Sequence, residues 1–151
     1  MKAVIQRVRY ASVKVEDKIV GSIDNGLLIL LGINHNDTEG EANWLAKKII
    51  SLRIFQDEND KMNLGLDEVH GELLVISQFT LYGDCIKGRR PGFIDAAPPS
   101  IAVPLYEKFL EICKISGIKT ESGIFGADMK VELLNDGPVT LIIDTNNVKN
   151  L

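Results

Sequence analysis

The sequence predicts a single α/β (α+β) domain in which a mostly antiparallel sheet wraps as a barrel-like layer around two main helices. Three observations lead to this prediction. The chain has 151 residues, of which 45% are hydrophobic, which is enough to bury one core. Strand-like runs outnumber helix-like ones, and the two alternate too sparsely for a doubly wound nucleotide fold. The sequence also lacks a glycine-rich phosphate loop of either common type.

The first third of the chain is predicted to form strands. Side chains of different character alternate over residues 3–8 and 13–15, and a turn at Asp17-Lys18 indicates a short hairpin. After the turn signal Asp24-Asn25-Gly26, residues 27–31 are apolar on both faces. That pattern is typical of a central strand that is covered on both sides.

The middle of the chain predicts a helix and a second apolar strand. Thr38 and Glu41 have the spacing of a capping box, and apolar residues then recur at helical spacing, so we predict a helix from about Glu39 to Ser51. Residues 55–63 are polar and acidic, and residues 64–69 are ambiguous. A strongly apolar strand is predicted over residues 72–81.

The last third predicts another helix and two strands. Residues 95–99 are expected to open the helix, with Ser100 available as its cap and Gly117 at its end. Pro104 would lie in its first turns or kink them. Residues 129–134 and 139–144 are predicted strands, and residues 135–138 the turn between them.

Charge and composition limit the possible functions. Seventeen basic and 21 acidic side chains give a formal charge of −4, so any contact with RNA must be local. The one dense basic cluster, Lys87, Arg89 and Arg90, lies in a predicted loop, and its plain interpretation is a solvated turn. The N-terminus does not have the pattern of a signal peptide, and the longest apolar run is too short to cross a bilayer.

Metal and cofactor sites are not expected. Cys85 and Cys113 lie far apart, and neither His35 nor His70 adds a ligand cluster to them. Both histidines are predicted in exposed loops, so no convincing base for an esterase nucleophile is present. A cytosolic protein without metal or cofactor is the simplest interpretation.

Three polar side chains at the end of the strand 72–81 are the first candidates for chemistry. Ser77, Gln78 and Thr80 either bond to neighbouring backbone or open into a cleft. In the second case, backbone N–H groups near Phe79 and Thr80 would bind a developing oxyanion. The residues alone favour the structural interpretation.

The pair Gly137-Pro138 has a plain interpretation and two further ones. Between two strand-like runs it is expected to reverse the chain. An X-Pro bond can also be cis at small cost, and glycine leaves the neighbouring carbonyl groups approachable. Met129, on the preceding strand, is more often core filler than a ligand contact.

These segments together resemble the D-aminoacyl-tRNA deacylase family in its bacterial form, from Met1 almost to Asp144. Several separated motifs in the same order make the resemblance specific. They are Met1-Lys2-Ala3-Val4-Ile5-Gln6-Arg7-Val8, Leu52-Arg53-Ile54-Phe55, Lys61-Met62-Asn63, Ser77-Gln78-Phe79-Thr80-Leu81-Tyr82, Lys87-Gly88-Arg89-Arg90-Pro91, Ala96-Ala97-Pro98-Pro99, Phe125-Gly126-Ala127-Asp128-Met129 and Asn135-Asp136-Gly137-Pro138-Val139-Thr140.

The resemblance implies hydrolysis of the ester that joins a D-amino acid, or glycine, to the 3′ end of tRNA, by a cytoplasmic homodimer. It implies that Gly137-Pro138 has a cis peptide bond and reaches into the partner's active site, where its carbonyls reject L-residues. Such a main-chain filter would accept many D-amino acids. The resemblance assigns no cofactor and no metal.

Two accounts of the chemistry remain open under this resemblance. Either Thr80 is the nucleophile, or the 2′-hydroxyl of the tRNA provides the activation; we favour the second. Gln78 and Phe79 would then have oxyanion and adenosine-facing roles, while Ser77, Thr80 and Met129 shape the pocket. Lys87, Arg89 and Arg90 would contact tRNA phosphates.

Some features depart from the family pattern or lie outside it. Gly83 and Gly92 stand where alanine and serine are expected, and both flank the basic loop. The deacylase domain is expected to cover residues 1–145, followed by a disordered tail, 146–151. The rival functions are a non-catalytic tRNA-binding module and a small-molecule esterase that uses Thr80 or Cys85.

Overall fold

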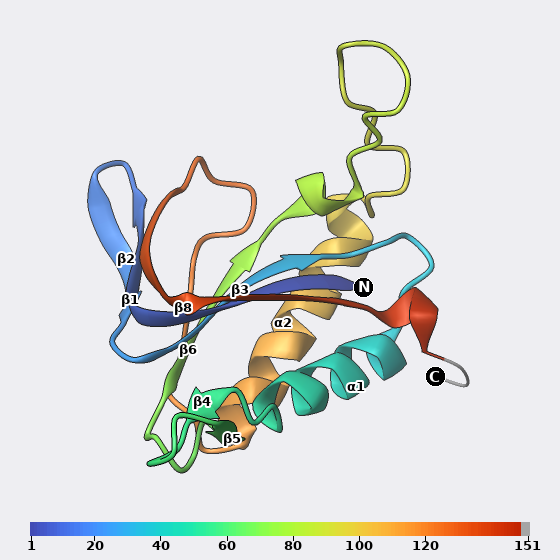
Figure 1. Cartoon of the computed structure of the whole chain (residues 1–151). Coiled ribbons are helices and arrows are strands. Elements are labelled where there is room, and N and C mark those ends of the chain that lie inside the picture. Colours follow the sequence, from blue (N-terminus) through green and yellow to red (C-terminus); the bar gives the residue numbers. More distant parts are fainter. Residues whose placement is uncertain (149–151) are drawn as a thin grey trace.

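The computed structural model describes residues 1–148, which form one six-stranded sheet with two helices packed against it (Figure 1). Strand β1 (Lys2–Val15) pairs antiparallel with β2 (Lys18–Ile23), β3 (Gly26–Gly32) and β8 (Lys130–Asp144). Strand β6 (Glu72–Ser77) runs parallel to β3 and to β7 (Thr120–Ser122). The sheet is therefore mixed, with antiparallel pairing around β1 and parallel pairing around β6.

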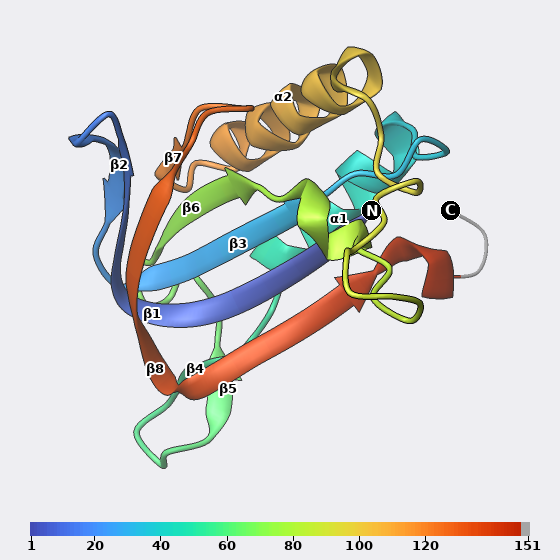
Figure 2. The same ribbon diagram turned by 90° about the horizontal axis from the view of Figure 1, so that it is seen from above.

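Helices α1 (Glu39–Ile50) and α2 (Pro99–Ile115) lie side by side on one face of the sheet (Figure 2). Apolar residues of both helices meet those of β1, β3 and β6 in the larger core cluster. The other face of the sheet curls around a second cluster, made mainly by β1, β6 and the start of β8. The predicted fold class is confirmed, and the barrel-like curvature encloses the second cluster, while the helices cover the outside.

The N-terminal half follows the sequence prediction closely. The hairpin β1–β2, the central strand β3 and the capping box of α1 are all present. Strand β3 is buried along nearly its whole length because the two core clusters cover its two faces. The polar segment after α1 forms a small separate hairpin of β4 (Phe55–Gln56) and β5 (Met62–Leu64).

Two predictions around the second helix are corrected. The predicted strand 72–81 ends at Ser77, because its parallel ladder with β3 ends at the pair Leu31 and Ser77; Phe79–Tyr82 form a short 3₁₀ helix, η1. Ser100 does not cap α2. Pro98 occupies the N-cap position, and Pro99 fits the first helical turn because it has no N–H group to satisfy there.

The predicted turn at 135–138 is wrong. Strand β8 runs through these residues without reversing, and it pairs with β1 on both sides of a bulge. Beyond β8, residues Thr145–Asn147 form the short helix η2, so the expected disordered tail starts with an ordered turn. Residues 149–151 of that tail lie outside the described part of the chain.

Candidate active site

A cavity of about 280 Å³ opens where β6 ends. Its walls come from the ends of β3 and β6, from the first turn of α2 and from the segment that leads into β8. The lining residues are Leu31, Ile33, Ile76, Ser77, Gln78, Phe79, Ala97, Ala102, Phe125, Gly126, Ala127, Asp128, Met129 and Val131. Four of the site residues predicted from the sequence, Ser77, Gln78, Phe79 and Met129, therefore meet at one mostly apolar cavity with a few polar groups.

The change from strand to 3₁₀ helix gives the polar end of the cavity its geometry. The N–H of Gln78 still donates to the carbonyl of Leu31, at 2.8 Å, as the last bond next to the β3 ladder. Phe79 and Thr80 then open η1, so their N–H groups have no carbonyl of the same helix to bond. Because Phe79 lines the cavity and Thr80 follows it directly, these are the two N–H groups on which the oxyanion interpretation can draw.

Thr80 does not line the cavity, but its side chain is held by a residue that does. The side-chain amide Nε2 of Gln78 donates to Oγ1 of Thr80 at 2.5 Å. His35 and His70 are both exposed, as predicted, and neither belongs to the cavity lining. The arrangement therefore provides donors near Thr80 and no histidine base beside it.

Phe79 forms part of the cavity rim. Its side chain is 57% exposed, and its ring meets Phe93 edge-on, with the centroids 5.1 Å apart. A Cβ at Gly83 would lie 3.1 Å from the Phe93 ring and from the Thr80 carbonyl, so glycine permits this close packing. The structure thus explains glycine at position 83, but Gly92 faces open space, and nothing in the structure explains its difference from the family pattern.

The far wall of the cavity is fixed by buried packing. Met129 packs over Gly123, where a Cβ would collide with the Met129 sulfur, so it is both core filler and cavity wall. Phe125 packs against Tyr106, whose hydroxyl donates to the Val75 carbonyl at 2.8 Å. Burial raises the pKa of Tyr106, so this hydroxyl stays neutral and acts as a structural donor.

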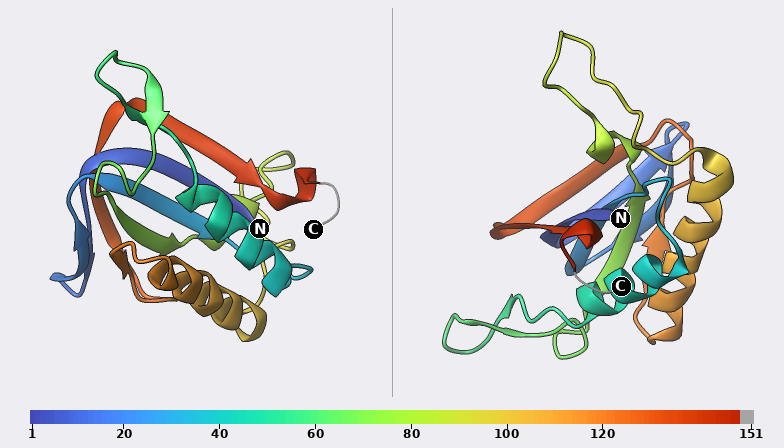
Figure 3. Two further views of the ribbon diagram at one scale, coloured as in Figure 1. Left: turned by 90° about the horizontal axis from the view of Figure 1, so that it is seen from below. Right: turned by 90° about the vertical axis from the view of Figure 1, so that its right-hand side faces the viewer.

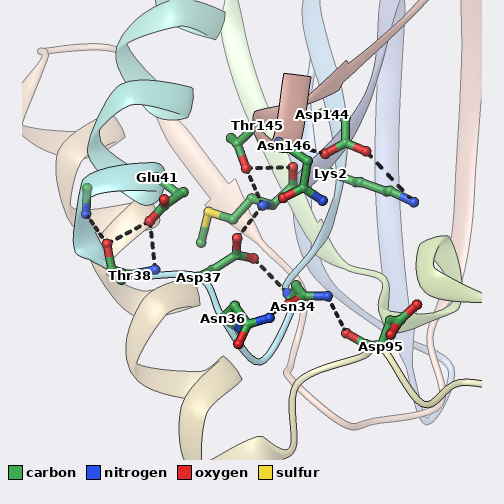
Figure 4. Close-up of polar contacts among 12 residues, drawn as sticks. Lys2, Asn34, Asn36, Asp37, Thr38, Glu41, Asp95, Asp144, Thr145 and Asn146 are labelled. Atoms are coloured by element: carbon green, nitrogen blue, oxygen red, sulfur yellow. Dashed lines mark hydrogen bonds and ion pairs between the residues drawn. The ribbon is translucent and has the colours of Figure 1, made fainter. Parts of the chain in front are cut away.

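A polar network around the first residue supports the loop that follows β3 (Figure 4). The α-ammonium group of Met1 pairs with Oδ1 of Asp37 at 2.5 Å, and the N–H of Asn34 donates to Oδ2 of the same carboxylate at 2.6 Å. Asn34 Nδ2 donates to the carbonyl of Asp95 at 2.8 Å. These bonds connect the β3 loop to the segment before α2, and each of these two segments contributes to the cavity wall.

Gly137 and Pro138 are exposed and do not line the cavity of their own chain. The peptide bond between them is cis. Val131, which lines the cavity, lies on the same strand, and at about 3.3 Å per residue the strand can carry Gly137 at most about 20 Å away from it. The structure therefore does not bring this pair together with Ser77–Thr80 within one chain.

Arg7 is a buried charged residue beside Gly137 that the sequence interpretation missed. Its side chain is only 4% exposed, its Nε donates to the carbonyl of Asp136 at 3.0 Å, and its Nη1 donates to that of Ile54 at 2.6 Å. A Cβ at Gly137 would lie 3.0 Å from Arg7 Nη2. The signal was present in the sequence: Arg7 follows Ala3 and Ile5 on the core-facing side of β1, where a charged residue requires partners.

The basic loop stands away from the body of the protein (Figure 3). Reciprocal backbone hydrogen bonds between Asp84 and Gly92, at 2.8 and 2.9 Å, close its base. Lys87, Arg89 and Arg90 are exposed in it. The loop can therefore present all three cations to a polyanion beyond the cavity rim.

Within residues 1–148 no three side chains of His, Cys, Asp or Glu are grouped so that they could hold a metal ion. Among the helices of this part of the chain, none is both long and apolar enough to pass through a bilayer.

Comparisons with known proteins agree over nearly the whole chain. The model of the family described as D-Tyr-tRNA(Tyr) deacylase matches residues 4–144. A D-aminoacyl-tRNA deacylase from Desulfatibacillum aliphaticivorans is 61% identical over 96% of this chain and 99% of its own, and one from Thermosipho africanus is 59% identical over 98% and 99%. A solved structure titled c-Myc DNA Unwinding Element Binding Protein has a TM-score of 0.88 and 39% identity, over 95% of this chain and 98% of that one.

Proposed function

The chain belongs to the D-Tyr-tRNA(Tyr) deacylase family, and we propose that its cavity is where the ester of a D-aminoacyl-tRNA is hydrolysed to free tRNA and a D-amino acid. As a D-aminoacyl-tRNA deacylase it is a carboxylic ester hydrolase, and tRNA is part of its substrate. The observation that carries the site assignment is the pair of available N–H groups on Phe79 and Thr80 beside a mostly apolar cavity. We place the activity in the cytoplasm, where charged tRNA is used.

The proposed chemistry needs no protein nucleophile. Water attacks the ester carbonyl carbon, the oxyanion of the tetrahedral intermediate accepts bonds from the Phe79 and Thr80 N–H groups, and the bond to the ribose 3′-oxygen then breaks. That oxygen takes a proton, and the amino acid leaves as the carboxylate. The neighbouring ribose 2′-hydroxyl orients the water. Gln78 contacts the reacting group, and Thr80 holds the Gln78 side chain through their 2.5 Å hydrogen bond.

Chirality is proposed to come from the backbone of Gly137-Pro138 of a partner subunit. The pair is exposed and does not line the cavity of its own chain, so we propose that a second copy supplies it to the substrate there. Main-chain atoms facing the substrate's α-carbon would exclude an L side chain and make no demand on a D side chain. Glycyl-tRNA, which has no side chain to exclude, would also be hydrolysed.

The homodimer that this requires is supported by the surface of β8. Among residues 1–148 this long strand pairs only with β1, which leaves one of its edges free, and Leu134, Leu141 and Ile142 are exposed on the strand. A long, apolar edge strand is normally covered in a soluble protein. A second copy of the chain, which brings its own β8, is the occupant we propose.

The basic loop is proposed to contact tRNA phosphates near the acceptor end. Lys87, Arg89 and Arg90 project from the loop that begins just after η1, and η1 itself borders the cavity. A local contact of this kind is compatible with the overall negative charge of the chain.

The decisive experiment measures ester loss from D-Tyr-tRNA, L-Tyr-tRNA and Gly-tRNA with the same enzyme preparation. We expect rapid loss from the D and glycyl substrates and none above the spontaneous rate from the L substrate. Equal rates on the D and L esters would remove the chirality filter. No hydrolysis, with tRNA binding retained, would favour the non-catalytic binding module.

A small-molecule esterase is the remaining rival, and the geometry gives it little support. Burial raises the pKa of the Cys113 thiol to about 12, so this cysteine is not a ready nucleophile. Cys85 is exposed in the basic loop and does not line the cavity. Hydrolysis of p-nitrophenyl acetate that is lost in Cys85→Ser and retained in Gln78→Ala would favour this rival.

A further inference from the structure

Four residues of β8 leave the ladder with β1. Val8 pairs with Asn135 and Gln6 pairs with Thr140, so a single residue of β1, Arg7, faces the whole stretch 136–139. Such an excess of chain on one strand is a bulge, and its backbone groups lack ladder partners. The conformation of Gly137-Pro138 must therefore be fixed by other bonds.

The side chain of Asn135 spans this bulge from one end to the other. Its Oδ1 accepts a hydrogen bond from the N–H of Val139 at 2.8 Å. Its Nδ2 donates to Thr140 Oγ1 at 3.0 Å and reaches the Val139 carbonyl at 3.4 Å. The amide thus supplies both a donor and an acceptor at the point where the strand returns to the ladder.

Val139 and Thr140, at the C-terminal end of the bulge, also contact β1 and the core. Gln6 Nε2 donates to Thr140 Oγ1 at 3.2 Å, so this hydroxyl accepts from both amides. Val139 is 6% exposed and belongs to the larger core cluster. A Cβ at Gly137 would lie 2.8 Å from Val139 Cγ2, so the glycine backbone packs directly on this anchored residue.

We propose that Asn135 is a positioning residue for chiral selection, which holds the backbone of Gly137-Pro138 in the direction that excludes L-aminoacyl esters. The inference rests on the proposed role of this pair as the filter. Steric exclusion by main chain works only if the backbone is held within a fraction of an ångström of its place. Asn135 does not line the cavity, so its loss affects selection more than the rate on D substrates.

The test compares Asn135→Ala and Asn135→Asp with the wild type. For Asn135→Ala we expect the ratio of the D-Tyr-tRNA to the L-Tyr-tRNA rate to fall about tenfold or more, mainly through gained L hydrolysis. Asn135→Asp keeps the acceptor for the Val139 N–H but loses the donor to Thr140, so a smaller fall is expected. Thr140→Ser keeps the hydroxyl and should keep the ratio, while Thr140→Val should lower it.

A second measurement follows the hydrogen bond between the Val139 N–H and Asn135 Oδ1. Hydrogen exchange of the Val139 amide should be faster in folded Asn135→Ala, because its acceptor is gone. Asn59→Ala, in the β4–β5 hairpin, is the matched control and should leave both the ratio and this exchange unchanged. If Asn135→Ala does not fold, Asn135→Asp and the pair Thr140→Val and Thr140→Ser provide the test: the ratio should fall in Asn135→Asp and in Thr140→Val, and it should stay unchanged in Thr140→Ser.

Different results would contradict the backbone filter and the role of Asn135. A wild-type enzyme that hydrolyses D and L esters equally would overturn the filter and this inference with it. A wild type that discriminates, together with folded Asn135→Ala that keeps both the rate ratio and the Val139 protection, would overturn the role of Asn135 alone.

Discussion

Arg7 joins two segments that are distant in sequence, because its guanidinium donates to the carbonyls of Ile54 and Asp136. Removing the side chain leaves both acceptors without this donor. We predict that Arg7→Ala lowers the free energy of unfolding by about 2–4 kcal/mol, as measured by urea titration. The control is Arg9→Ala: Arg9 pairs with Asp136 at 3.1 Å but is 66% exposed, so a change within about 0.5 kcal/mol is expected. Equal losses in both variants would contradict this role of Arg7.

Thr80 and Gln78 differ in their distance from the reaction. The side chain of Gln78 belongs to a residue that lines the cavity, whereas the side chain of Thr80 only accepts a hydrogen bond from it. We predict that Thr80→Ala keeps much of the D-Tyr-tRNA hydrolysis, because the backbone N–H of residue 80 remains, while Gln78→Ala lowers kcat by about 100-fold, because it removes the side chain that contacts the reacting group. Single-turnover kinetics at saturating enzyme separates binding from chemistry. Near-total loss in Thr80→Ala with binding retained would return the nucleophile role to Thr80.

At the residue scale, the sequence predicted which side chains lie at the cavity better than it predicted their hydrogen-bond partners. Ser77, Gln78, Phe79 and Met129 were named from local pattern and family resemblance, and they do meet at one cavity. Arg7 was missed because its partners, the carbonyls of residues 54 and 136, are far from it along the chain. Periodicity shows which face a residue occupies, but it does not show which carbonyls approach that face.

At the element scale, the sequence predictions were wrong where the course of a strand depends on its pairing with a neighbouring strand. The strand predicted to reach residue 81 ends at Ser77, where its parallel ladder with β3 ends at the pair Leu31 and Ser77 and the chain turns into the helix η1. Gly137-Pro138 has the local composition of a turn, yet β1 continues alongside and pairs with β8 on both sides of it. In both cases tertiary pairing overrides a correct local signal.

Helix α1 shows the opposite case, because its start is encoded locally. Thr38 Oγ1 accepts from the N–H of Gly40 at 3.1 Å, and Glu41 Oε2 accepts from the N–H of Thr38 at 2.8 Å. We predict that Thr38→Ala lowers the free energy of unfolding by about 1 kcal/mol. Urea unfolding at neutral pH checks the value, and no change would contradict the stabilising role of the capping box.

The same box predicts a pH dependence. The hydrogen bond from the Thr38 side chain lowers the pKa of Glu41 below its ordinary value of 4.5. A carboxyl with a lowered folded-state pKa stabilises the protein above that ordinary value, and this stabilisation is lost as the pH falls through the folded-state pKa. The difference in unfolding free energy between wild type and Glu41→Gln should therefore shrink below pH 4.5. Glu39→Gln, in the same helical turn but outside the box, is the control.

At the scale of the whole molecule, the chain is acidic overall, and the loop that carries Lys87, Arg89 and Arg90 stands away from its body (Figure 3). We predict that Arg89→Ala with Arg90→Ala weakens tRNA binding and lowers the salt slope of log Kd by about 1 per lost phosphate contact. Lys47→Ala with Lys48→Ala removes the same charge from α1 and should leave the slope unchanged. An unchanged slope in the loop variant would identify the loop as solvated surface.

The free edge of β8 makes a prediction about assembly. Ile142 is 74% exposed on this strand, and a charge there would be buried if a second β8 covers it. We predict that Ile142→Glu shifts the protein from dimer to monomer in light scattering at matched concentration. Ile19→Glu, at an exposed apolar position on β2, is the control and should leave the mass unchanged. A monomeric wild-type protein would contradict the proposal that a second copy contributes to the site.

A dimer alone does not establish that one subunit completes the site of the other, but mixed dimers can. Pro138→Gly frees the backbone of the proposed filter, so its homodimer should gain L-Tyr-tRNA hydrolysis. Gln78→Ala inactivates the cavity but leaves Gly137-Pro138 intact. After subunit exchange with excess Gln78→Ala, each active cavity faces an intact filter from its partner, and L hydrolysis should fall. If the filter acts on its own chain's cavity, L hydrolysis should not change on mixing, because each active cavity then keeps its altered filter.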